Sequence, residues 1–354
     1  MSGIKITGET FSNRDDVLGM RYTPGARWQF MHPEYKVEYA INEHGFRDKK
    51  EHSIPKPKGT IRVLLVGDSF TFGQGVDYEQ AWPVIAEKWF EEHDMRQIEL
   101  VKAGIQGMDT RSEFLLIKEL LEEYECDVIV IGFLVNDLYA NSLYRIEQIG
   151  EKSIFNNSDS SGVAAENKTE EDHWLKTMRN VFVRNDRKSN FHLFTLAKRL
   201  AIASENLYCK LYLLSSSAEY LTVPLPQGPK QKLKITEILF KRIADYCQSK
   251  GKKLIVFSMP QQFQVLYLQQ SFNSECIDVH YYDRHFSNMA NQETFIWVAI
   301  LNAFINNNTE HENMFYRLDG HFTPTGNEFV AENFLLKVLP FIEETTLIPK
   351  NKRE

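Results

Sequence analysis

The stretch IRVLLVGDSF, residues 61–70, decides the fold prediction. Five of its first six residues are apolar and mostly branched, which is typical of a strand buried on both faces of a sheet. Gly67, Asp68 and Ser69 follow at once, and residues 79–92 have a helix-like pattern. The order of strand, Gly-Asp-Ser turn and helix indicates an open α/β sheet with its site at the carboxyl ends of the strands.

The Gly-Asp-Ser tripeptide is by itself a weak functional signal. An ordinary strand-to-helix turn uses Gly for its backbone freedom and Asp and Ser as helix caps. Asp68 is expected to be a structural hydrogen-bonding residue, because its side chain should point away from that of Ser69. A catalytic reading of Ser69 therefore depends on which other residues converge on it.

Strand and helix patterns alternate along the rest of the chain. Further strands are expected at residues 97–101, 127–135 and 253–258, with a short one near 277–282. Helices are expected at 111–124, 231–250, 292–305 and 326–344. This alternation implies parallel strand pairing and right-handed crossovers, and hence an α/β sandwich.

Residues 1–60 are interpreted as an N-terminal arm packed on the core, with a strand at 35–41 in a hairpin or extended arm. Arg47 in this arm is expected to be either an exposed ion-paired residue or a contact to an anionic substrate. The α/β domain is expected at 61–345 and a tail at 346–354.

The pattern breaks at about 138–229, which is interpreted as a helical insertion with helices at 174–200 and 207–214. Beside strand ends, such an insertion fits a lid or substrate wall, and a decorative helical excursion is equally consistent with the sequence.

Composition excludes several classes of protein. The 354 residues, 43% of them hydrophobic, are enough for a substantial core. A net charge of -7 without a long basic run argues against nucleic acid as the main partner. No apolar run is long enough to span a membrane and the start lacks a signal-peptide pattern, so a cytoplasmic location is expected. The four cysteines lie far apart and predict neither a metal site nor a disulfide framework.

Chemically useful residues follow several of the predicted strands. Ser69 and Asn136 should emerge side by side where the strand order reverses, and the loop after the second strand brings Gly107 close. Acyl transfer through a serine needs a base, a group that orients the base, and donors for the oxyanion. His321 and Asp319, in the loop before the last helix, can supply the base and the orienting group.

The predicted oxyanion donors are the backbone N–H groups of Ser69 and Gly107 and the side-chain amide of Asn136. His280 and His285, near another predicted strand end, are second choices for the base. This chemistry requires neither a metal nor a cofactor.

These residues resemble the SGNH or GDSL hydrolases, a family named for the Ser, Gly, Asn and His of four sequence blocks. The matching segments are 67–69, 103–107, 132–137 and 319–321. Three details differ from the common pattern: Lys102 stands where Asn is common, three residues separate Gly132 from Asn136 where one is more usual, and one residue separates Asp319 from His321 where many members have two. The shorter acid–base spacing also occurs in branches that act on polysaccharides, and the arm is similar to that of bacterial members of uncertain substrate.

The resemblance implies an α/β three-layer sandwich with a mostly parallel, flavodoxin-like central sheet, the SGNH hydrolase fold. It further implies a serine esterase or deacylase that forms an acyl-enzyme on Ser69 and acts on a small-molecule or saccharide ester. Two alternatives remain open: an O-acyltransferase that modifies a saccharide with the same triad, and a non-catalytic carbohydrate- or partner-binding domain. The residues specify neither the acyl group, nor the alcohol, nor the oligomeric state.

Overall fold

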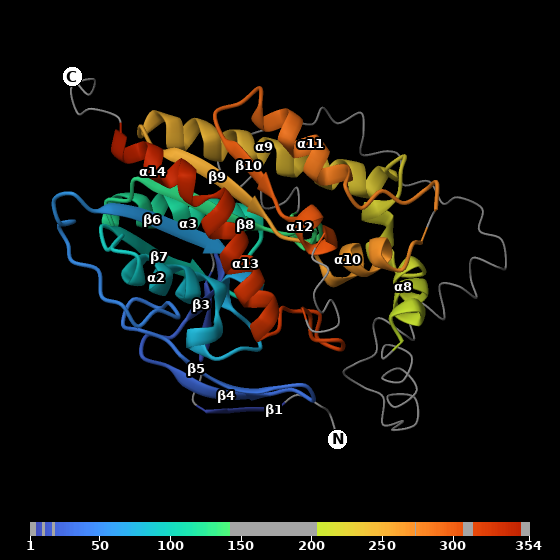
Figure 1. Ribbon diagram of the computed structural model, residues 1–354, viewed down its shortest axis with the longest axis horizontal. Coiled ribbons are helices and arrows are strands. Elements are labelled where there is room, and N and C mark those ends of the chain that lie inside the picture. Colours follow the sequence, from blue (N-terminus) through green and yellow to red (C-terminus); the bar gives the residue numbers. More distant parts are fainter. Residues whose placement is uncertain are drawn as a thin grey trace.

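The fold is built on a five-stranded parallel sheet, seen in a computed structural model that describes residues 5–8, 11–15, 18–141, 204–272, 274–306 and 314–347 (Figure 1). Its strands are β6 (Ile61–Gly67), β7 (Ile98–Gly104), β8 (Val128–Phe133), β9 (Lys253–Ser258) and β10 (Ile296–Ala299). Their spatial order is β10-β9-β8-β6-β7, with every neighbouring pair parallel. Counted along the chain this order is 2-1-3-4-5, so the predicted flavodoxin-like sheet is confirmed.

Strand β6 lies inside the sheet, and all seven of its residues are buried. It pairs with β7 on one side and with β8 on the other. The chain therefore reverses its direction of travel across the sheet at β6, and in sheets of this kind ligands bind at the carboxyl ends of the strands beside such a reversal. The Gly-Asp-Ser turn was expected to present its serine at this end of β6.

Helices cover both faces of the sheet and make the predicted three layers (Figure 1). Helix α2 (Trp82–Glu92) packs against α13 (Pro324–Lys337), while α3 (Thr110–Glu123) packs against α9 (Gln227–Ser249). Trp82 of α2 is fully buried, and its ring centroid lies 5.6 Å from that of Phe257 in β9. Among the described residues, no helix is both long and apolar enough to span a membrane.

Two predictions for the region before α13 are wrong. The expected strand at 277–282 is a turn followed by helix α11 (Tyr281–Ala290), which buries positions 282, 286 and 290 at helical spacing. The expected helix at 292–305 begins instead as strand β10, and only its end forms helix α12 (Leu301–Asn306). With four residues, β10 is too short for its periodicity to be recognised in the sequence.

The predicted final helix is divided in two. Helix α13 ends at Lys337, and α14 (Leu339–Leu347) begins immediately afterwards. Pro340 explains the break, because proline has no backbone N–H to continue the helical hydrogen bonds.

The described part of the predicted insertion includes α8 (Glu205–Leu213) and the 3-10 helix η2 (Ser216–Leu221). Helix α8 confirms the prediction of a helix near 207–214, whereas the one expected at 174–200 lies outside the described residues. The division of the chain at residues 60 and 345 stays a prediction.

The N-terminal arm contains an antiparallel sheet and a separate hairpin. The sheet has the order β1-β4-β5, formed by β1 (Lys5–Gly8), β4 (Arg27–Met31) and β5 (Lys36–Ala40), and the hairpin joins β2 (Ser12–Asp15) to β3 (Gly19–Tyr22). Tyr22 and Tyr39 pack on the ring of Phe72, with ring centroids 5.3 and 5.1 Å away. The arm thus packs directly against the residues that follow Ser69.

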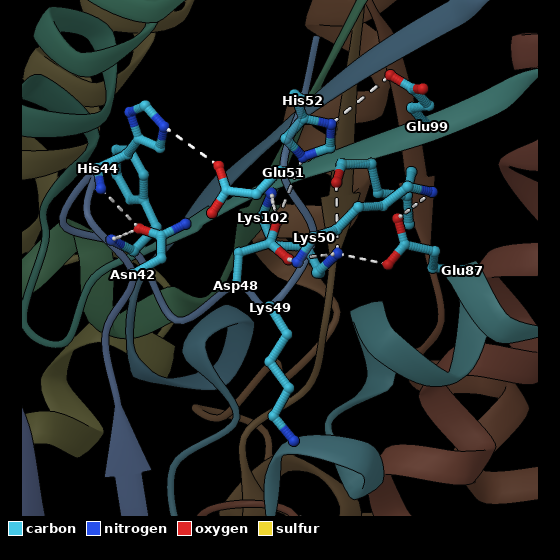
Figure 2. A network of polar contacts seen from close by, with 12 residues as sticks. Asn42, His44, Asp48, Lys49, Lys50, Glu51, His52, Glu87, Glu99 and Lys102 are labelled. Atoms are coloured by element: carbon cyan, nitrogen blue, oxygen red, sulfur yellow. Dashed lines mark hydrogen bonds and ion pairs between the residues drawn. The ribbon is translucent and has the colours of Figure 1, made fainter. Parts of the chain in front are cut away.

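A buried charge cluster fastens the end of the arm to the sheet (Figure 2). Lys102 of β7 is 4% exposed, and its ammonium lies 2.9 Å from the Asp48 carboxylate and 2.6 Å from that of Glu87. Two anions thus neutralise one buried cation, as buried charges require. Lys102 thus joins Asp48 of the arm to β7 and α2.

Candidate active site

Ser69 is the first residue of α1 (Ser69–Phe72), a short helix that starts directly after β6. Asp68 caps this helix, since its Oδ1 accepts a hydrogen bond of 2.9 Å from the backbone N–H of Phe70. The side chain of Thr71 turns back toward the sheet: a Cβ added at either Gly67 or Gly132 would lie 2.2 Å from its Oγ1. Both strands must therefore have glycine where they leave the sheet.

The structure brings Ser69, His321 and Asp319 into one hydrogen-bonded chain. His321 Nε2 lies 2.7 Å from Ser69 Oγ, and His321 Nδ1 lies 2.7 Å from Asp319 Oδ2. Between the acid and the base, Gly320 has a φ of +83°. This left-handed turn, which glycine adopts at little cost, lets Asp319 reach its neighbour across a single intervening residue.

The environment of Asp319 keeps it charged. Burial works to raise its pKa, but the hydrogen bond and positive charge of His321, the charge of His32 and a hydrogen bond from Tyr35 outweigh burial. The net result is a pKa below the ordinary value for aspartate. An ionised carboxylate in this position orients the imidazole with Nδ1–H toward Asp319 and leaves Nε2 to accept the proton of Ser69.

Asn136 lies beside the serine turn, as predicted. It belongs to α4 (Val135–Ala140), and its Nδ2 donates a hydrogen bond of 2.8 Å to Asp68 Oδ2. Burial raises the pKa of Asp68, while the hydrogen bonds from Phe70 and Asn136 act against burial. Asp68 is thus the structural residue that was expected, and it fixes the amide of Asn136 next to Ser69.

Gly107 lies in the loop after β7, at the same end of the sheet. Its neighbour Gln106 donates from Nε2 to Gln74 Oε1 at 2.6 Å, and Gln74 Nε2 lies 3.4 Å from His321 Nδ1. The backbone N–H of Gln106 also donates to the Tyr22 hydroxyl at 3.2 Å. The loop of Gly107 is thus linked to the triad through two glutamine side chains, and its part in an oxyanion hole stays a prediction.

No family model matches the sequence, and no curated protein sequence matches it. Solved structures do resemble it. The psychrotrophic esterase EstA from Pseudoalteromonas sp. is 9% identical with a TM-score of 0.42, over 80% of this chain and 98% of that chain. The acetyl xylan esterase AlAXEase is 15% identical with a TM-score of 0.43, over 78% and 100%. A member of the lipolytic protein G-D-S-L family from Veillonella parvula DSM 2008 is 10% identical with a TM-score of 0.36, over 78% and 98%.

The second-choice histidines lie elsewhere. His285 of α11 is paired through Nε2 with Oε1 of Glu237 in α9, at 2.8 Å. The backbone N–H of His280 donates to Asp278 Oδ1 at 3.1 Å, just before that helix. His321 is the histidine that the structure places on Ser69.

The expectation that Arg47 is an exposed ion-paired residue is wrong. Its side chain is buried, and its guanidinium donates to the backbone carbonyls of Phe72, Gly73 and Val76 at 3.0, 2.7 and 2.7 Å. The carbonyls at the end of a short helix need donors, and the guanidinium fork supplies several at once. Arg47 therefore holds the loop after the serine helix.

Two buried carboxyl groups lie behind the serine turn. Asp137 and Glu113 are 1% and 0% exposed, and burial together with neighbouring carboxylates, including Asp68, raises the pKa of both well above ordinary values. Among the described residues, neither oxygen of Glu113 has a hydrogen-bond partner. Burial therefore disfavours a negative charge on either group behind the site.

Proposed function

We propose that this protein is a serine hydrolase that cleaves ester bonds through an acyl-enzyme on Ser69. The observation that carries this proposal is the continuous chain from Ser69 Oγ through His321 to Asp319, with both contacts at 2.7 Å. A nucleophile, a base within hydrogen-bond reach and a group that orients the base are the requirements for this chemistry.

Each step has a residue to perform it. His321 Nε2 takes the proton of Ser69 Oγ as this oxygen attacks the ester carbonyl, and Asp319 stabilises the imidazolium. The oxyanion then accepts hydrogen bonds from the backbone N–H groups of Ser69 and Gly107 and from the amide of Asn136. The alcohol leaves with the proton from His321, and water releases the acid by the same steps in reverse.

The surroundings of the triad support a neutral, polar ester as substrate, such as a carbohydrate O-acyl ester. The side chains of Gln74 and Gln106 border His321 and carry amide groups without charge. Amides both donate and accept hydrogen bonds, which suits the hydroxyl groups of a sugar. The short distance along the chain between Asp319 and His321, a feature also found in branches that act on polysaccharides, agrees with this assignment.

Hydrolysis of p-nitrophenyl acetate tests the proposal. We expect steady turnover by the wild type and a loss of at least about 10³-fold in Ser69→Ala, because the nucleophile is gone. Ser258→Ala is the matched control, since Ser258 lies at the carboxyl end of strand β9 but donates to Asp283 Oδ1 at 2.7 Å. Equal rates for wild type and Ser69→Ala would exclude the enzyme function, and product formation that depends on an added sugar acceptor would indicate an acyltransferase.

The Asn136→Ala variant tests the oxyanion hole. We expect kcat to fall by about 10²–10³-fold with little change in KM, because the lost donor acts on charge that develops only in the transition state. The variant also leaves Asp68 without one of its donors, so folding is compared by circular dichroism. A rise in KM at unchanged kcat would place Asn136 in substrate binding instead.

A further inference from the structure

The turn between β4 and β5 of the arm touches the loop that holds the catalytic acid and base. Residues 32–35 form this turn, closed by a backbone hydrogen bond of 2.8 Å from His32 N–H to the Tyr35 carbonyl. Its side chains meet Leu318 and Asp319, more than 280 positions later in the sequence. The arm is therefore part of the surroundings of the proposed site and does more than cover the core.

Tyr35 hydrogen-bonds the catalytic carboxylate directly. Its hydroxyl donates to Asp319 Oδ2 at 3.0 Å, and this same oxygen accepts from His321 Nδ1. Burial, followed by the negative charge of Asp319, raises the pKa of Tyr35 far above the ordinary value, so the hydroxyl stays a donor. Its ring is held between His32 and Tyr316, with centroid distances of 4.9 and 4.7 Å.

Glu34 holds the backbone of the same loop. Its Oε2 accepts hydrogen bonds from the backbone N–H groups of Leu318 and Asp319, at 2.9 and 3.0 Å. Hydrogen bonds to an ionised acceptor are stronger than those between neutral groups. Two of them on consecutive residues fix the direction in which the chain carries Asp319 toward His321.

We propose that Glu34 and Tyr35 are positioning residues for the Asp319–His321 pair, so that the catalytic apparatus includes the N-terminal arm. This inference rests on the proposed esterase function. Tyr35 fixes the carboxylate that orients the imidazole, and Glu34 fixes the backbone beneath that carboxylate. Neither residue reaches the serine or is assigned a contact with substrate.

The test variant Tyr35→Phe keeps the ring between its neighbours and removes only the hydroxyl. We expect kcat to fall about tenfold or more, with KM unchanged within about twofold, because a hydrogen bond to a charged group is lost from the orienting carboxylate. We also expect the acid limb of kcat/KM to move to higher pH. Without the Tyr35 donor, the carboxylate of Asp319 stabilises protonated His321 more strongly.

The pH dependence of kcat/KM can be affected by the titratable groups around Asp319 and His321. Among the described residues, and besides Tyr35, the titratable groups whose electrostatic interactions involve this pair are His32, Tyr39 and Tyr316 around Asp319, and Asp68 beside His321. All remain in place in Tyr35→Phe, and Glu34 still holds the backbone of the loop. A shift of the acid limb in this variant therefore reports the loss of the Tyr35 hydroxyl.

Tyr78→Phe is the matched control. Tyr78 also donates its hydroxyl to a carboxylate, here that of Asp48 in the arm at 3.1 Å, but this carboxylate is not part of the triad. We expect its kcat and pH profile to equal those of the wild type. An equal loss of kcat in Tyr78→Phe and Tyr35→Phe would overturn the inference, since the effect would then be a general loosening of the arm.

Glu34 is tested by comparing a conservative and a truncating variant. Glu34→Gln keeps an acceptor oxygen for the two backbone N–H groups, whereas Glu34→Ala removes it. We expect kcat to be about tenfold lower in Glu34→Ala than in the wild type. In Glu34→Gln we expect kcat to stay close to the wild-type value. Equal activity of the wild type and Glu34→Ala would exclude a positioning role for Glu34.

The same variants show whether only the role of the arm is wrong or whether the proposed esterase function is wrong as well. A wild-type kcat and pH profile in Tyr35→Phe, together with an inactive Ser69→Ala, would overturn the role of the arm alone. Turnover that is insensitive to Ser69→Ala would remove the esterase function and this inference with it.

Discussion

His321→Ala and Asp319→Asn are each expected to lower kcat on p-nitrophenyl acetate by about 10⁴-fold. In His321→Ala the base that contacts Ser69 Oγ is absent. In Asp319→Asn the shape remains, but an amide N–H turned toward His321 Nδ1 favours the tautomer that carries its proton on Nε2. That tautomer cannot accept the proton of Ser69, so the two losses should be comparable.

A double variant and a control variant at a second histidine test this prediction further. Residues that act as a unit have non-additive effects, so His321→Ala/Asp319→Asn should lose about as much activity as either single variant. His285→Ala is the control, because His285 is paired with Glu237 away from the serine. A loss in Asp319→Asn much smaller than in His321→Ala would show that another group orients the base.

Lys102→Met is expected to lower the free energy of unfolding by about 3–5 kcal/mol, because it removes the buried ammonium that lies between the carboxylates of Asp48 and Glu87. Urea unfolding followed by circular dichroism measures the loss. Lys50→Met is the matched control: Lys50 also pairs with Glu87, at 3.3 Å, but its side chain is 30% exposed. We expect it to lose about 1 kcal/mol or less, and equal losses would contradict the assignment.

The pH dependence of this loss follows from the pKa shifts in the cluster. Burial works to raise the pKa of Asp48, but His52, the charge of Lys102 and the N–H of Lys50 lower it below its ordinary value. A depressed carboxyl pKa stabilises the fold above the unfolded-state pKa, and this stabilisation is lost as pH falls through the folded-state pKa. The difference between wild type and Lys102→Met should therefore be full at neutral pH and shrink below about pH 4.

The pKa of Lys102 sets the alkaline limit of the pH range in which the cluster stabilises the fold. Burial works to lower its pKa, but the charges of Asp48 and Glu87 outweigh burial and raise the pKa above the ordinary value for lysine. A raised lysine pKa contributes stability that is fully present below the unfolded-state pKa and is lost only as pH rises through the folded-state pKa. The cluster should thus stabilise the protein throughout the neutral range.

The sequence allowed the sheet to be predicted where its strands were long. Strands such as β6 and β8 are largely apolar runs with Gly, Asp or Asn at or soon after their ends, and such runs have few alternative interpretations. The four residues of β10 offered no such pattern, and the apolar spacing of α11 was not recognised. Short edge elements are defined by what they pack against, which a local pattern does not reveal.

The contacts of the candidate site likewise fall into those that the sequence predicted and those that it did not. Ser69, Asn136, Asp319 and His321 could be predicted to meet because each follows a strand or precedes a helix whose place in the sheet was predictable. Other contacts depend on how the arm docks. Nothing in the sequence near Tyr35 indicates a partner 284 positions away, and the turn that contains Arg47 gave no sign that its side chain would be buried under the serine loop.

The packing of Thr71 between Gly67 and Gly132 has a practical meaning for protein engineering. These positions belong to two different strands, yet a methyl group at either glycine would collide with the same hydroxyl. Anyone who transplants the serine turn into another scaffold, or recombines segments between homologous enzymes, should carry the three positions over together. A chimera that takes the serine turn from one parent, and from another parent a larger residue at the position of Gly132, would place that residue against Thr71, beneath Ser69.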